Sequence, residues 1–253
     1  MRTIVLFLIL LGCGTSHITA QNDYLVTTIP NQEDPLSEEE QFIKENFPLQ
    51  LLCKWTSGMK FMFIPSGRDM FLPTLSVYET EKGADNSVLK HKILTFAGYE
   101  EKSQKLSNDM SYSTRLIFEC DGEKYYYEIK NTRPDEICEK NPRAYINGLV
   151  NLKDVDTAKD LLTGRKIYVQ SDMAQVDDAN SYSGYREVSI PVNTEATITA
   201  IGVGSQAYPV KIIFQDSQGH SYYLEVALSR TNSGMDVSDF QAEKKMRYFS
   251  NAI

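Results

Sequence analysis

The chain contains the same series of sequence blocks twice. Residues 114–129 read TRLIFECDGEKYYYEI, and residues 210–226 read VKIIFQDSQGHSYYLEV. Three further pairs of blocks match in the same order: residues 56–63 with 162–169, residues 92–98 with 196–202, and residues 140–149 with 244–253. Matching blocks in one order indicate an internal duplication. We therefore expect two copies of one folding unit, at residues 45–149 and 150–253.

Each of the two long blocks predicts a β-hairpin. Two runs rich in β-branched and aromatic residues flank a short polar turn that contains Gly122 in one copy and Gly219 in the other. Side chains alternate between the two faces of a strand. The alternation assigns to the core face Leu116, Phe118, Tyr125, Tyr127 and Ile129, with Ile212, Phe214, Tyr222, Leu224 and Val226.

Helical patterns are fewer. Residues 154–164 have an aspartate at the capping position and a glycine as the stop, and residues 37–46 begin with a serine followed by glutamates. Near the end of the chain, apolar residues recur at helical spacing: Ala242, Met246, Phe249 and Ile253. We expect a mainly β fold in which each unit is a four- or five-stranded sheet with one or two short helices.

The rhythm of each unit resembles a known module. A strand that begins with a lysine (Lys60; Lys166) is followed by a long irregular arm (residues 65–87; 171–191) and three closely connected strands. This order resembles the tandem bacterial SH3-like modules of exported envelope proteins. The resemblance implies two tandem duplicated small SH3-like β-barrel domains with a binding or structural role. A pair of small β-sandwich domains is the alternative, since short strands with turn signals also suit that class.

The N-terminal residues are typical of a targeting segment. Arg2 precedes an apolar run at residues 4–11, which is shorter than the ~20 residues a membrane-spanning helix needs. We expect a signal peptide at residues 1–20, followed at residues 21–44 by a segment with a short helix. The LLGC sequence that ends at Cys13 resembles a bacterial lipobox, so lipidation of Cys13 is the alternative. The protein is therefore expected to be exported, periplasmic or extracellular, or else to be an outer-membrane lipoprotein.

Charge and composition narrow the partners. The chain has 34 acidic residues against 26 basic ones, for a formal net charge of −8. Contacts with nucleic-acid phosphates need concentrated lysine and arginine, so a nucleic-acid partner is not expected. An envelope protein, a peptide or a glycan fits better, with a membrane contact only through a lipidated Cys13. No cofactor and no metal site are expected.

The sequence contains no complete catalytic signature, so we expect a protein that is not an enzyme. A cysteine hydrolase that pairs Cys120 with His91 or His220 is the alternative. Three cysteines follow the predicted signal peptide, and either Cys53 or Cys120 could form a disulfide with Cys138. A lipid-anchored surface subunit of a larger complex, attached through Cys13, is a further alternative.

The predicted outward face carries one feature in both copies. Tyr126 is followed two residues later by Glu128, and Tyr223 by Glu225. Outward tyrosines can bind a peptide or a sugar by stacking and hydrogen bonding. These four residues are therefore the candidate ligand contacts. In the alternative, the two tyrosines lie under a helix or between the two units.

Overall fold

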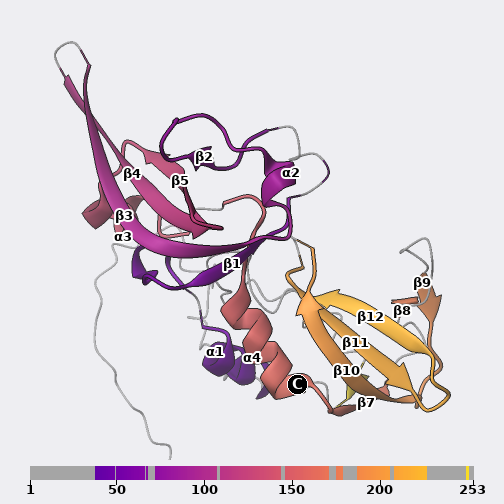
Figure 1. Cartoon of the computed structure of the whole chain (residues 1–253). Helices are drawn as coiled ribbons and strands as arrows, with labels where there is room; N and C mark the ends of the chain where they lie inside the picture. The colour runs from indigo at the N-terminus through magenta and orange to yellow at the C-terminus, as the bar shows by residue number, and fades with distance from the viewer. Residues whose placement is uncertain are drawn as a thin grey trace, which may run out of the picture. The chain divides into compact units, whose positions relative to one another are not determined.

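In a computed structural model, the chain is mainly β, as predicted, and forms two antiparallel sheets (Figure 1). The structure describes residues 38–48, 50–65, 67, 72–106, 109–143, 146–170, 175–178, 187–205, 208–226 and 249–250. The predicted signal peptide and Cys13 lie outside these residues.

The first sheet has six strands, in the order β2-β5-β4-β3-β1-β6. Its strands are β1 (Lys60–Phe63), β2 (Ser76–Val77), β3 (Ile93–Leu106), β4 (Asp109–Cys120), β5 (Glu123–Lys130) and β6 (Leu149–Asn151). The predicted hairpin is formed by β4 and β5. The sheet has more strands than predicted. Strands β2 and β6 were not predicted, because they are too short to show an alternating pattern.

The second sheet has seven strands, in the order β13-β7-β10-β11-β12-β8-β9. Its strands are β7 (Lys166–Val169), β8 (Gln175–Asp178), β9 (Glu187–Ser189), β10 (Glu195–Val203), β11 (Val210–Asp216), β12 (Ser221–Val226) and β13 (Phe249–Ser250). The second predicted hairpin is formed by β11 and β12.

The helices are short. They are α1 (Glu38–Asn46), η1 (Leu52–Lys54), α2 (Asn86–Leu89), η3 (Pro134–Glu136), α3 (Ile137–Lys140) and α4 (Leu152–Leu162). The two predicted helices correspond to α1 and α4. Helix α4 begins earlier than predicted, because the side chain of Asn151 accepts a hydrogen bond from the Lys153 N–H at 3.0 Å and caps the helix.

The predicted C-terminal helix is wrong at residues 249–250. These residues form β13, in which Phe249 pairs with Val169 of β7. Here the backbone pairs with strand β7, although the apolar residues are spaced as in a helix. The other residues of that stripe lie outside the described part of the chain.

The two sheets share their strand order. Read from β8, the second sheet runs β8-β12-β11-β10-β7-β13, which matches the first sheet read from β2, and β9 is the additional strand. A hydrogen bond from the glycine that precedes β1 also has a counterpart before β7. The Gly58 N–H donates to the Phe96 carbonyl at 2.8 Å, and the Gly164 N–H donates to the Ile198 carbonyl at 2.8 Å. Among the described residues, no pairing joins the edge strands β2 and β6. The first sheet is open there, and the SH3-like barrel and the domain boundaries stay predictions.

A β-bulge lies at the same place in both sheets. In β3 the register shifts between Phe96 and Gly98, and in β10 it shifts between Ile198 and Ala200. Two residues, Ala97 and Gly98, therefore face one residue of β4. The bulge lets Phe96 and Tyr99 both face the core although they are three residues apart.

Each sheet packs on its own hydrophobic cluster. The first cluster is aromatic and centres on Trp55, Phe61, Phe96 and Phe118, whereas the second is mostly aliphatic, with Phe214 in it. The predicted core face is confirmed on β4 and β11, where Leu116, Phe118, Ile212 and Phe214 are fully or almost fully buried. Each such side chain contributes about 1.5–3 kcal/mol through burial.

Candidate binding site on the outer face of the first sheet

The two predicted contact tyrosines are not open to solvent. Tyr126 is 6% exposed and Tyr223 is 7% exposed. Tyr126 lies beside Ser76 of strand β2, and Tyr223 lies beside Asp177 of strand β8. A short strand, and not a helix, therefore runs beside each tyrosine.

Arg115 fixes the surroundings of Tyr126. Its guanidinium lies 4.1 Å from the centroid of the Tyr126 ring and donates to the Glu81 carboxylate at 2.7 Å. Burial is the largest single influence and opposes the charge of Arg115, but the hydrogen bond to Glu81 and the Coulomb attraction of neighbouring groups together outweigh it, so the pKa of Arg115 is raised. The Nε atom of Arg115 is buried, with no hydrogen-bond partner in the described structure.

Glu81 ties the segment after β2 to the sheet. It accepts from Arg115 and from the Lys102 ammonium, which is 3.0 Å away. These hydrogen bonds, that from Arg115 above all, hold the pKa of Glu81 below its usual value. The turn that carries Glu81 and Tyr78 is thereby held against the outer face.

The second sheet repeats the pairing of a cation with a tyrosine. The Lys211 ammonium lies 3.7 Å from the centroid of the Tyr223 ring, at the place that corresponds to Arg115 and Tyr126. The predicted glutamates are bonded within the protein. Glu128 accepts from the Ser113 hydroxyl at 2.7 Å, and Glu225 accepts from the Ser205 N–H at 3.1 Å. Contact of these four residues with a ligand stays a prediction.

A hollow of about 280 Å³ lies beside this cluster on the outer face. It is lined by Tyr78, Ala97, Gly98, Tyr99, Glu100, Ile117 and Lys124. Ile117 alternates with the core residues Leu116 and Phe118, so it faces outward, yet it is only 8% exposed. The bulge contributes Gly98, at which a Cβ would meet nothing within 4 Å. Sequence reasoning missed this hollow because it depends on the bulge and on a turn distant in sequence.

Two opposite charges line the same hollow. The Tyr78 hydroxyl donates to the Glu100 carboxylate at 2.6 Å, and this hydrogen bond raises the pKa of Tyr78. Lys124 belongs to β5, and its backbone carbonyl accepts from the Tyr78 N–H at 2.9 Å. The ammonium of Lys124 is half-exposed and lies 3.7 Å from the Glu119 carboxylate. The site thus combines an apolar floor with one negative and one positive group.

The second sheet lacks these charges. In its pairing register, Ile213 corresponds to Ile117, Gly202 to Glu100 and Ser221 to Lys124. The apolar floor residue is kept, and both charged residues are absent. The second sheet therefore offers a matched control for changes of the floor residue Ile117.

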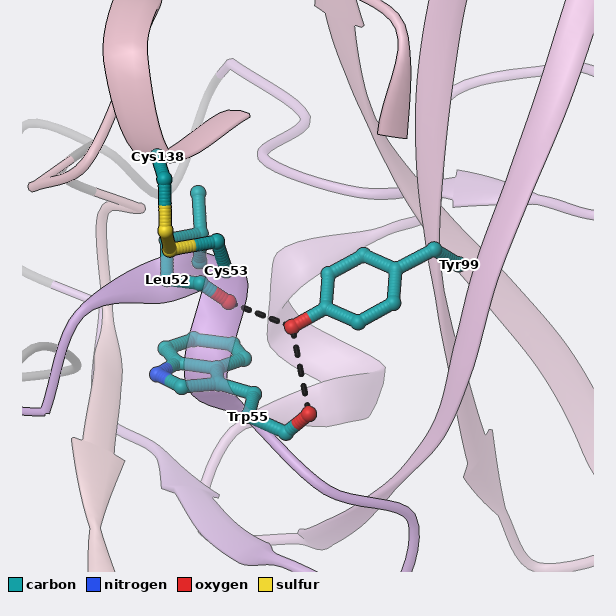
Figure 2. The surroundings of a disulfide bond; sticks show 5 residues. All are labelled: Leu52, Cys53, Trp55, Tyr99 and Cys138. Carbon is teal, nitrogen blue, oxygen red and sulfur yellow. Dashed lines mark hydrogen bonds between the residues drawn. A yellow bond between two sulfur atoms is a disulfide. The ribbon is translucent and has the colours of Figure 1, made fainter. Parts of the chain in front are cut away.

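A disulfide lies near Tyr99, on the core side of the first sheet (Figure 2). Cys53 of η1 is bonded to Cys138 of α3, which settles the pairing that the sequence left open. The Tyr99 hydroxyl donates to the Leu52 carbonyl and lies 3.2 Å from the Trp55 carbonyl. Burial raises the pKa of Tyr99 to about 12. Tyr99 therefore connects the disulfide segment with the strand that lines the hollow.

The residues of the hydrolase alternative, Cys120, His91 and His220, do not form a catalytic pair in the described structure. Cys120 is a free thiol, 5% exposed, and burial raises its pKa, whereas a nucleophilic cysteine needs a lowered one. His220 lies at the turn of the second hairpin, with its ring Nδ1 3.1 Å from the Asp216 carboxylate. Among the described residues, no hydrogen bond joins Cys120 to His91 or His220. These features favour structural roles, and the hydrolase alternative stays untested.

A second hollow, of about 480 Å³, is lined by residues 56–60 and by residues of α4 and its cap. Its charged side chains, Lys60, Lys153, Asp156 and Asp160, are all exposed. Within the described residues, no three His, Cys, Asp or Glu side chains are grouped to hold a metal ion, and no helix is long and apolar enough to cross a membrane.

Comparison with known proteins adds no relative: no family model, no curated protein and no solved structure matches the chain.

Proposed function

We propose that the protein is an exported, non-catalytic binding or structural module of the bacterial cell envelope, built from two duplicated SH3-like units. In this proposal the ligand binds on the outer face of the first sheet. The shared strand order and bulge of the two sheets support the duplication. The Cys53–Cys138 disulfide supports export, since such bonds persist mainly in oxidising compartments.

One observation carries the binding role. The hollow joins a nearly buried apolar floor, Ile117, to an aromatic wall, Tyr78, and to the two charges of Glu100 and Lys124. Binding sites for small groups combine a mostly apolar lining with a few fixed polar groups in this way. The ligand is an envelope protein, a peptide or a glycan.

The test is to fill the hollow and to measure binding. Ile117→Trp places a large ring in the hollow, and Ile213→Trp makes the same change at the corresponding place of the second sheet. Both variants and the unchanged protein are applied to peptide and glycan arrays. We expect the first variant to lose at least tenfold in affinity for the ligands found and the second to retain it.

Folding must be controlled in this test. Circular dichroism and thermal unfolding show whether Ile117→Trp keeps the fold. Lys124→Glu provides a second variant in case it does not, because Lys124 is half-exposed and contributes little to the core. Ligand binding that is unchanged in both variants would contradict the proposal.

A further inference from the structure

The size of the hollow limits what it can hold. Its volume of about 280 Å³ lies at the lower end of the ~300–1,000 Å³ that is typical of small-molecule pockets. A single side chain or a single sugar ring is therefore a suitable occupant, with the remainder of the ligand on the surface around it.

The chemistry of the lining favours an apolar side chain over a sugar ring. The Tyr78 hydroxyl is already bonded to Glu100, and the guanidinium of Arg115 lies 6.0 Å from the centroid of the Tyr78 ring. The Tyr126 ring meets Tyr78 edge to face at 6.4 Å. A sugar needs an open aromatic face and free polar groups, whereas the floor here offers Ile117, Ala97 and the backbone of Gly98.

The register of the strands places the two charges on opposite sides of that floor. Glu100 pairs with Arg115 and Lys124 pairs with Glu119, so they lie two residues before and two residues after Ile117 along β4. Glu100 is on β3 and Lys124 on β5, the two neighbours of β4. With strands ~4.8 Å apart and ~3.3 Å per residue, the two Cα atoms lie about 16 Å apart on a diagonal through Ile117.

We infer that the hollow anchors one apolar side chain of an extended peptide segment of a partner protein, with opposite charges two residues before and two residues after the anchor. Four steps of extended chain cover about 13 Å, and the side chains span the rest. The acidic residue of the partner pairs with Lys124 and the basic residue with Glu100. This inference rests on the proposed function and names the partner of the same site.

The test uses four synthetic peptides with one pattern. Asp-Ser-Leu-Ser-Lys carries the inferred features, and Asp-Ser-Ser-Ser-Lys lacks the anchor. Asp-Ser-Leu-Ser-Asp and Lys-Ser-Leu-Ser-Lys carry like charges. Each is flanked by glycines, labelled with a fluorophore and titrated with the full chain in a fluorescence anisotropy assay. We expect the first peptide to bind at least tenfold more tightly than the peptide without leucine and several-fold more tightly than the like-charged pair.

A change of the site should change the preference. In Lys124→Glu both charges at the hollow are negative, so the lysine-lysine peptide should become the preferred ligand. Lys130→Glu is the matched control, because it makes the same change of net charge on an exposed residue of the same strand. That variant should keep the preference of the unchanged protein. A merely structural role for Lys124 would not exchange one preference for another.

The outcomes separate the two levels of the proposal. Equal binding of the peptides with and without leucine, or an unchanged preference in Lys124→Glu, overturns the inference. Binding of a glycan that Ile117→Trp abolishes also overturns it but leaves the proposed function intact. If neither peptides nor glycans bind at this face, both fall.

Discussion

At the scale of single residues, the buried tyrosines of the outer face show how a surface position can become part of the fold. Tyr126 alternates with core residues and so points away from the core, yet β2, Arg115 and Tyr78 surround it. Its outward direction was predictable from the pattern. Its burial was not, because the covering turn lies about fifty residues earlier in the chain, beyond the reach of any local pattern.

Truncation of these tyrosines should therefore destabilise the protein. Tyr126→Ala and Tyr223→Ala each remove a buried ring that a cation contacts, Arg115 at 4.1 Å and Lys211 at 3.7 Å. We expect each to lower the free energy of unfolding by about 3 kcal/mol, as large-to-small changes in cores do. Urea denaturation measures this, with Glu119→Ala as an exposed control that should change it by less than about 0.5 kcal/mol. A stability loss no larger than that of the control would show that the two rings are not packed as described.

Tyr99 should make the stability depend on pH in the alkaline range. Its pKa is about 12 in the folded protein because of burial, against 10.0 for the free side chain. A raised pKa gives a contribution to stability that is complete below pH 10 and is lost as the pH rises towards 12. Tyr99→Phe should be less stable at neutral pH, because it loses the hydrogen bond to Leu52, and should lose less stability between pH 10 and 12.

Urea denaturation of both proteins at a series of pH values checks this prediction. Burial also raises the pKa of Tyr125 to about 12, so part of the alkaline loss remains in the variant. Equal slopes of stability against pH in the two proteins would be inconsistent with a buried, neutral Tyr99.

At the scale of elements, the bulge decides which residues face the site. Ala97 and Gly98 together oppose Ile117, so removal of Ala97 leaves a regular strand in which Tyr99 still faces the core. Removal of both residues moves Tyr99 to the outer face, because a shift of one residue turns every following side chain over. We expect the single deletion to fold and to lose ligand binding, and the double deletion to unfold the first sheet.

Deletion of Thr199, which corresponds to Ala97 in the second sheet, is the control and should keep binding. Circular dichroism and thermal unfolding measure whether each of the three variants folds, and the binding assay measures its affinity for the ligand. A double deletion that unfolds at the same temperature as the single one would argue against the described register.

Sequence patterns predicted the elements that are local and missed those that depend on distant partners. The hairpins formed by residues 109–130 and 210–226 were predictable because alternation and a glycine turn lie within one stretch. Strands β2 and β6 were missed because two or three residues carry no pattern. The aligned blocks matched Leu149 with Ile253, whereas the pairing registers match Leu149 with Phe249. Only the partner strand distinguishes these two alignments.

At the scale of the whole molecule, the disulfide belongs to one of the two hydrophobic clusters. The Cys53–Cys138 bond closes a loop with a sequence separation of 85, which contains strands β1 to β5. Residues of the second cluster lie largely outside that loop. A crosslink stabilises mainly by restricting the unfolded chain, by about 4–5 kcal/mol for a loop of this length. Its effect should therefore be confined to the first sheet.

We accordingly expect two unfolding transitions, of which only one responds to the disulfide. Trp55 is the only tryptophan and lies in the first cluster, so its fluorescence reports the first sheet alone. In Cys53→Ser/Cys138→Ser this transition should move to lower urea concentration, while hydrogen exchange of residues 210–226 stays unchanged. Cys120→Ser, which keeps the disulfide, is the control and should lose only about 1 kcal/mol. If both signals shift together, the two sheets unfold as one cooperative unit, and the disulfide stabilises them both.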